Sequence, residues 1–150
     1  LAPAITKSER VMFREALADF DMGLEDRMNT KVGLLSGGQR QVVTLLMATL
    51  VPPRLLLLDE HTAALDPATA EKVMEITKRI VERENLTTLM ITHNVKSALE
   101  TGDRTIMLDA GDIIFDIGKE ERIGMTVEDL MKKYSNKKHE EFDNDRAIFS

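Results

Sequence analysis

An α/β fold is predicted, with parallel core strands, flanking helices and a C-terminal β-hairpin, and three observations support it. Leu55–Leu58 is a run of four leucines that follows two prolines, as expected of a short strand buried on both faces of a parallel sheet. Thr87–Thr92 is a second run of this kind. The apolar runs Arg104–Leu108 and Asp112–Ile117 flank a short turn containing Gly111, which indicates a hairpin.

Composition narrows the class of protein. The chain has 150 residues, of which 43% are hydrophobic and 31% charged, and these values are ordinary for one globular domain. It lacks cysteine, so disulfides and thiolate metal sites are excluded. The net charge of −6 and the aromatic content of 4% argue against a surface that binds nucleic acid. No apolar run reaches the length of a membrane span.

Two helices are predicted before the first strand. Apolar residues recur at helical spacing after Ser8, which is the expected N-cap of a helix that Gly23 ends. Ser36 stands just before another apolar-periodic run. It is therefore predicted to cap a helix from Gly37 to about Leu50.

The segment Ser36–Gln39 has the features of an anion site. A helix N-terminus presents unpaired N–H groups and the positive end of the helix dipole. Gly37 and Gly38 lack a Cβ, so their backbone can approach a ligand closely. An ordinary capped helix with a glycine-rich start explains these residues as well.

Polar residues follow both predicted core strands, at the edge where α/β sheets bind ligands. Asp59 and Glu60 are adjacent, so they are expected to face opposite ways and to play different roles. One suits a cation and the other a water molecule. His93 follows the second strand. Asp66, followed by Pro67, predicts the start of a helix that runs to about Arg83.

The order and spacing of these motifs resemble the ABC (ATP-binding cassette) ATPases over roughly residues 20–118, and the strand, loop and helix contexts agree. Leu35–Gln39 matches the signature motif of that family, Leu-Ser-Gly-Gly-Gln. Leu55–Glu60 is similar to the Walker B strand with its catalytic glutamate. Ala64–Asp66 resembles the D-loop, and His93 the switch histidine. The resemblance implies a partial RecA-like P-loop NTPase fold.

The resemblance also implies hydrolysis of ATP with Mg²⁺ as cofactor. Glu60 and His93 are then the catalytic residues: Glu60 polarises the attacking water and His93 contacts the γ-phosphate. Asp59 is expected to hold Mg²⁺, through water.

The signature residues are expected to act in trans. By the resemblance, Ser36, Gly37, Gly38 and Gln39 bind the γ-phosphate of ATP held by the opposite protomer, and Asp66 contacts that protomer. Two composite sites imply a homodimer with two-fold symmetry. As an N-cap, Asp66 also has a sufficient structural role.

The sequence contains no G-x-x-x-x-G-K-[ST] phosphate loop, so the chain is expected to be the C-terminal part of a nucleotide-binding domain and inactive alone. Residues 1–50 are expected to hold the tail of the helical subdomain and the signature helix. Residues 51–134 are expected to hold the Walker B half of the core, ending in a short helix, Val127–Tyr134, capped by Thr126. Residues 135–150 are expected to form a mobile polar tail. Apolar sheet surface should be exposed where upstream strands belong, which favours oligomerisation or strand exchange.

Partners follow from the resemblance as well. The sequence around Gln39–Gln41 and Asp59–Asp66 is similar to that of bacterial importer ATPases, including a subgroup that handles amino acids such as tryptophan. Transmembrane permease subunits, an extracytoplasmic solute-binding protein and a place on the cytoplasmic face of the membrane are implied; a nucleic-acid partner is not.

Several alternatives stay open. Residues 1–50 include an amphipathic helix that requires no partner, and Arg40 is either solvated or directed to the partner protomer. His61, where the family commonly has Pro or Ala, suggests a metal site only weakly, because no second His is nearby. A non-transport ABC ATPase and a non-catalytic dimerisation module are the alternative functions.

Overall fold

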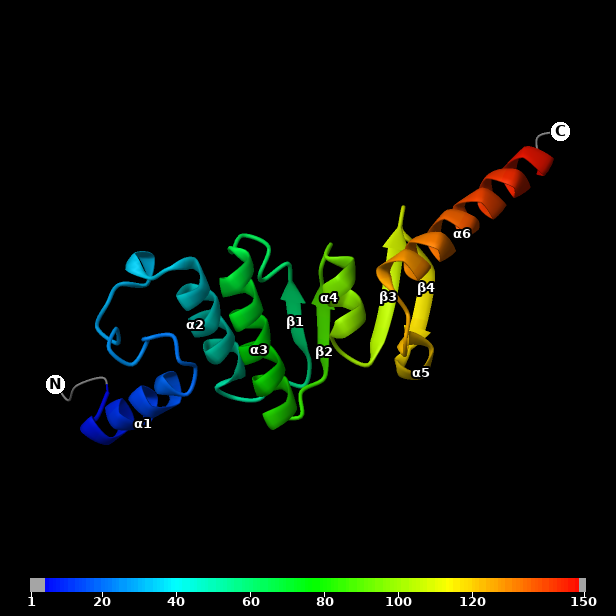
Figure 1. Ribbon diagram of the computed structural model, residues 1–150. Helices are drawn as coiled ribbons and strands as arrows, with labels where there is room; N and C mark the ends of the chain where they lie inside the picture. The colour runs from blue at the N-terminus through cyan, green and yellow to red at the C-terminus, as the bar shows by residue number, and fades with distance from the viewer. Residues whose placement is uncertain (1–4, 149–150) are drawn as a thin grey trace. The chain divides into compact units, whose positions relative to one another are not determined.

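The computed structural model describes residues 5–148, with side-chain surroundings for residues 5–137. The chain forms two compact units, the first ending at Ile91 and the second beginning at Thr92. In chain order the elements are α1 (Lys7–Ala18), the 3-10 turn η1 (Val32–Leu34), α2 (Gly37–Thr49), β1 (Leu56–Asp59), α3 (Pro67–Arg83), β2 (Thr88–Ile91), α4 (Val95–Glu100), β3 (Arg104–Asp109), β4 (Asp112–Gly118), α5 (Lys119–Arg122) and α6 (Val127–Ile148) (Figure 1).

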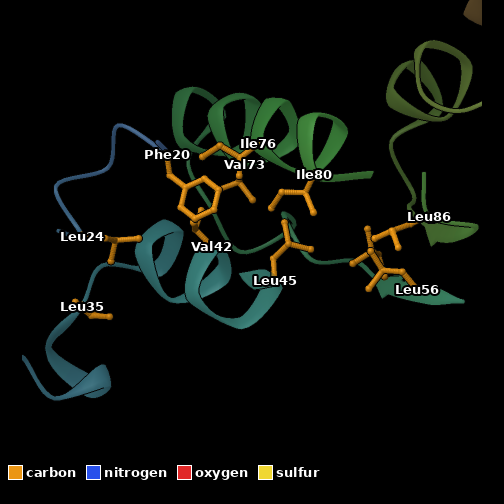
Figure 2. Packing of buried hydrophobic residues seen from close by; sticks show 11 residues of the cluster. Phe20, Leu24, Leu35, Val42, Leu45, Leu56, Val73, Ile76, Ile80 and Leu86 are labelled. Atoms are coloured by element: carbon orange, nitrogen blue, oxygen red, sulfur yellow. The ribbon is translucent and has the colours of Figure 1, made fainter. Parts of the chain in front are cut away.

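The core of the first unit lies between α2 and α3. Figure 2 shows Val73, Ile76 and Ile80 of α3 pointing toward Val42 and Leu45 of α2. Because four of these five side chains are at most 1% exposed, each stabilises the unit by roughly 1.5–3 kcal/mol relative to an exposed side chain. The helix predicted over 67–83, with its apolar face, is confirmed.

The strands β1 and β2 form a parallel pair, as predicted, with Leu56 opposite Thr88 and Asp59 opposite Ile91. The prediction that both faces are buried was wrong: Leu57 is 64% exposed, Leu89 51% and Ile91 53%. Side chains alternate between the faces of a strand, and only the face bearing Leu56 and Leu58 joins the core. The exposed apolar sheet surface expected from the sequence is therefore present.

Helix α1 begins and ends earlier than predicted. Its N-cap is Thr6, whose Oγ1 accepts a hydrogen bond from the Glu9 N–H at 3.2 Å while the Thr6 N–H donates to Glu9 Oε2 at 2.8 Å. This reciprocal capping box outcompetes Ser8 as the start of the helix. The helix ends at Ala18, so Phe20 lies beyond it and is buried in the core.

The second unit contains the predicted hairpin. β3 and β4 are antiparallel, and the turn between them places Ala110 at φ +50° and Gly111 at φ +96°. Two positive φ values in a row match the twist of a tight hairpin. The short helix α5 was not predicted; its Arg122 guanidinium donates to the Gly102 carbonyl at 2.7 Å, just after α4.

Helix α6 is longer than predicted. Thr126 and Asp129 form the expected capping box, with the Asp129 N–H 3.1 Å from Thr126 Oγ1. The helix continues from Val127 to Ile148 rather than ending at Tyr134, because residues 127–148 contain no Gly or Pro to end it. The tail expected from residue 135 is thus helical to Ile148, and residues 149–150 lie outside the described residues.

Candidate functional site

Ser36 caps the signature helix as predicted. The Gln39 N–H donates to Ser36 Oγ at 3.2 Å, and the Ser36 N–H donates to Gln39 Oε1 at 3.0 Å. Ser36 itself is exposed. The start of α2 therefore presents a fixed serine and the positive end of a helix dipole to the surroundings, an arrangement that attracts an anion.

The two signature glycines are required by packing against the segment that follows Glu60. A Cβ on Gly37 would lie 2.9 Å from Leu65 Cδ2, and a Cβ on Gly38 would lie 2.3 Å from Thr69 Cγ2. Both distances are well inside van der Waals contact. Close approach to a ligand was the sequence-based reason for these glycines, but the contact seen here is between α2 and the start of α3.

Gln39 has a structural role that the sequence did not predict. Besides completing the capping box, its Nε2 donates to the Met22 carbonyl oxygen at 2.9 Å. Both polar atoms of the amide are thereby engaged within the chain. Gln39 thus ties the loop before the signature to the signature helix, and its contact with a phosphate in trans stays a prediction.

The acidic pair follows β1 at a sharp turn. Asp59 is exposed at the end of the strand. Glu60 has φ +48°, a left-handed conformation that non-glycine residues adopt at a cost and that is enriched at functional sites. Its N–H donates to the Ile91 carbonyl at 3.0 Å, and its carbonyl accepts from the Ala63 N–H at 3.0 Å. The strand pairing thus extends to Glu60 before the chain turns.

Asp66 begins α3 as predicted. Its Oδ1 accepts a hydrogen bond from the Thr69 N–H at 3.1 Å, and Pro67 occupies the first helical position. Hydrogen bonds from the Thr69 side chain and backbone lower the pKa of Asp66, because they stabilise the carboxylate. The capping carboxylate is thus ionised at neutral pH, and its negative charge interacts favourably with the positive end of the α3 dipole.

His61 lies directly after the acidic pair, and its side chain contacts the middle of α3. Its Nε2 is 3.1 Å from Thr77 Oγ1, and Thr77 is buried. Burial lowers the pKa of His61, so the neutral ring is favoured. Among the described residues, no group of three or more His, Asp or Glu side chains is arranged to hold a metal ion, so nothing supports the metal alternative for His61.

Asp59 has the features that a Mg²⁺ ion requires from a protein. Mg²⁺ in nucleotide sites is held by one or two carboxylates together with phosphates and water. A single exposed carboxylate at the carboxyl end of a parallel strand is compatible with such a site, and the role of Asp59 stays a prediction.

His93 belongs to the second unit. Along the chain it follows Ile91, the ladder partner of Asp59, by two positions. It is exposed and directly precedes Asn94, whose Oδ1 caps α4 by accepting from the Ser97 N–H at 3.0 Å. Its role stays a prediction.

The first unit thus brings the signature motif and the D-loop together. Sequence reasoning named Ser36–Gln39, Asp59, Glu60 and Asp66 but missed the residues that support them. Met22, Thr69 and Thr77 serve this purpose. No motif marks these positions, because they contribute through tertiary contacts. Separately, none of the helices in the described part of the chain is both long and apolar enough to cross a membrane.

Comparison with known proteins gives a consistent picture. The sequence pattern of the ABC transporter family matches residues 6–63. The chain is 48% identical to a tyrosine transport ATP-binding protein of Clostridioides difficile over 79% of this chain and 47% of that protein. It is 40% identical to an aliphatic sulfonates import ATP-binding protein of Agrobacterium fabrum, over 69% of this chain and 39% of that one.

Two further comparisons extend over most of the chain. A phosphonates import ATP-binding protein of Lactobacillus johnsonii is 36% identical over 91% of this chain and 53% of that protein. The solved structure of an ABC transporter of the metal-chelate type, in an inward-facing conformation, matches with a TM-score of 0.67 at 24% identity, covering 90% of this chain and 53% of that one. The chain therefore spans about half the length of the relatives it matches, and the structural likeness supports the partial P-loop NTPase fold. Together with the signature motif and the acidic strand, these similarities show that the chain belongs to the ABC transporter ATP-binding family.

Proposed function

We propose that this chain is the signature-bearing part of an ATP-hydrolysing subunit that powers a bacterial ABC importer. The observation that carries the proposal is the contact of the signature motif with the D-loop and the start of α3, where Gly37 abuts Leu65 of the D-loop and Gly38 abuts Thr69 of α3. The signature motif and the loop that follows the acidic pair are thus parts of one packed unit.

In the proposed reaction, the protein positions water and phosphate rather than forming covalent bonds to them. Glu60 takes a proton from the attacking water, and its left-handed backbone determines the direction in which the side chain leaves the main chain. Asp59 would hold Mg²⁺, which when bound would supply positive charge beside the phosphate oxygens. His93 contacts the γ-phosphate and responds to its loss.

The ATP sites are proposed to lie between two protomers. Ser36 and the N–H groups of Gly37 and Gly38 face the γ-phosphate of ATP held by the other subunit, and Asp66 lies at the same interface. Helix α2 supplies its positive end to that phosphate. ATP then closes a two-fold dimer and hydrolysis opens it, which is how chemistry is coupled to a membrane partner.

The partners and the cargo are proposed by analogy. The relatives named above are described as ATP-binding proteins of tyrosine transport or of sulfonate and phosphonate import. We infer permease subunits, a solute-binding protein and a place at the cytoplasmic face of the membrane. The higher identity to the tyrosine transport relative favours an amino acid as cargo. A permease gene beside this one would support transport over the non-transport alternative.

Ser36→Arg in the complete gene product is expected to block ATP-driven dimerisation, because a long cation on the exposed cap would occupy the place of the γ-phosphate. Static light scattering with and without Mg²⁺-ATP measures this effect. Ser135→Arg, at an exposed position in α6, is the control and should dimerise normally. An unaltered ATP-dependent dimer of Ser36→Arg would contradict the proposed composite site.

A further inference from the structure

The turn that carries Glu60 is attached to α3 by a hydrogen bond from His61. Glu60 has a left-handed backbone, and the chain then makes two successive turns, closed by the Ala63 N–H to Glu60 carbonyl bond at 3.0 Å and the Leu65 N–H to Thr62 carbonyl bond at 3.2 Å. A left-handed non-glycine residue costs free energy and persists only where its surroundings fix it. The contact between His61 Nε2 and Thr77 Oγ1, at 3.1 Å, supplies such a constraint.

The direction of this hydrogen bond follows from the geometry at Thr77. The Thr77 hydroxyl donates to the Val73 carbonyl at 2.8 Å, and a hydroxyl has only one proton to donate. The Thr77 oxygen is therefore the acceptor toward His61, and His61 carries its proton on Nε2. Because Thr77 is 3% exposed, its oxygen lies in surroundings where an unmade hydrogen bond is costly.

We propose that His61 is a positioning residue for ATP hydrolysis, which fixes the orientation of Glu60 by anchoring the turn after β1 to Thr77 in α3. Two hydrogen bonds, from His61 to Thr77 and from Thr77 to Val73, join the turn to the most buried part of α3. His61 touches neither substrate nor Mg²⁺ in this account; it acts through Glu60. The inference rests on the proposed function, since it requires Glu60 to be the base.

The chain offers a matched control for the test. Thr49 is also buried, at 7% exposure, and its hydroxyl also donates to the carbonyl four residues earlier, that of Leu45, at 2.8 Å. Thr77→Val and Thr49→Val therefore remove the same group from a buried helical site. They differ in that the Thr77 oxygen accepts from His61.

The experiment measures kcat and KM for ATP in the complete gene product. Thr77→Val is expected to lower kcat roughly ten-fold, because a small displacement of a catalytic group costs rate steeply, while the KM for ATP stays at the wild-type value. Thr49→Val should keep the wild-type kcat. His61→Leu should behave like Thr77→Val, and His61→Gln, whose amide also donates from a nitrogen, should restore most of the rate.

The outcomes separate the inference from the proposed function. If the wild-type protein does not hydrolyse ATP, the proposed function fails. If the wild type is active but Thr77→Val and Thr49→Val have the same kcat, or His61→Leu and His61→Gln lose rate equally, the positioning role is wrong and the proposed function stands. If Thr77→Val does not fold, as judged by its thermal midpoint, the His61→Leu and His61→Gln pair decides.

Discussion

Replacing Glu60 with glutamine is expected to abolish ATP turnover while ATP still binds. Glutamine keeps the size of the side chain at this left-handed position, but its amide cannot take a proton from water. Loss of a general base typically lowers the rate about 100- to 10,000-fold. Turnover and ATP affinity, measured on the complete gene product, test both halves of this expectation.

The control for Glu60→Gln is Glu71→Gln, which makes the same change at an exposed position in α3 and should leave turnover unchanged. A Glu60→Gln protein with turnover within a few-fold of the wild type would mean that another group activates the water. The assignment of Glu60 as the base would then be wrong.

Gly38→Val is expected to cost about 1–3 kcal/mol of the free energy of unfolding, because it forces extra atoms into a filled core. Even a single Cβ at this position would lie 2.3 Å from Thr69 Cγ2 and 3.3 Å from Met22 Cε. Urea unfolding of the complete gene product measures the loss. Gly33→Val is the control, because no heavy atom lies within 4 Å of a Cβ at Gly33.

A double-mutant cycle identifies the contact that is responsible. Thr69→Ser removes Cγ2 but keeps the hydroxyl. It also keeps the backbone N–H that donates to Asp66, the N-cap of α3. Gly38→Ala should therefore destabilise the wild-type background more than the Thr69→Ser background, with a coupling of about 1 kcal/mol. Equal costs in the two backgrounds would show that Gly38 is not fixed by the contact between α2 and α3.

Much of the fold could be predicted because local chemistry agrees with tertiary structure in several elements. Ser36, Asp66 and Thr126 each precede a periodic run, and each caps the helix that follows. The hairpin turn was recognisable from Gly111. Prediction failed at α1, where Thr6 rather than Ser8 begins the helix, since two capping residues compete within one turn.

The long-range supports of the site could not be predicted. The sequence marks Gly37, Gly38 and Gln39 as a phosphate-binding motif, yet their observed contacts are with Leu65, Thr69 and Met22. His61 and Thr77 are 16 positions apart, and no periodic pattern joins them. Such contacts depend on how α2 and α3 pack, which periodicity alone does not determine. The exposed face of β1 follows from the absence of a phosphate-loop motif in the sequence and not from the apolar run itself.

The most direct test of the central claim is the alkylation rate of a cysteine introduced at position 36. The chain has no cysteine of its own, and a thiol at a helix N-terminus is reactive. Ser36→Cys would be placed in the Glu60→Gln background, so that ATP binds and is not consumed, and labelling of the peptide that contains position 36 would be followed by mass spectrometry.

Ser135→Cys, at an exposed position in α6, is the control. Mg²⁺-ATP is expected to protect the thiol of the Ser36→Cys variant strongly, and this protection should be lost when the protein is diluted to monomer. Labelling of the Ser135→Cys variant should not change. If the thiol at position 36 is labelled at the same rate with and without ATP, the signature motif does not close on a nucleotide and the composite ATP site is wrong.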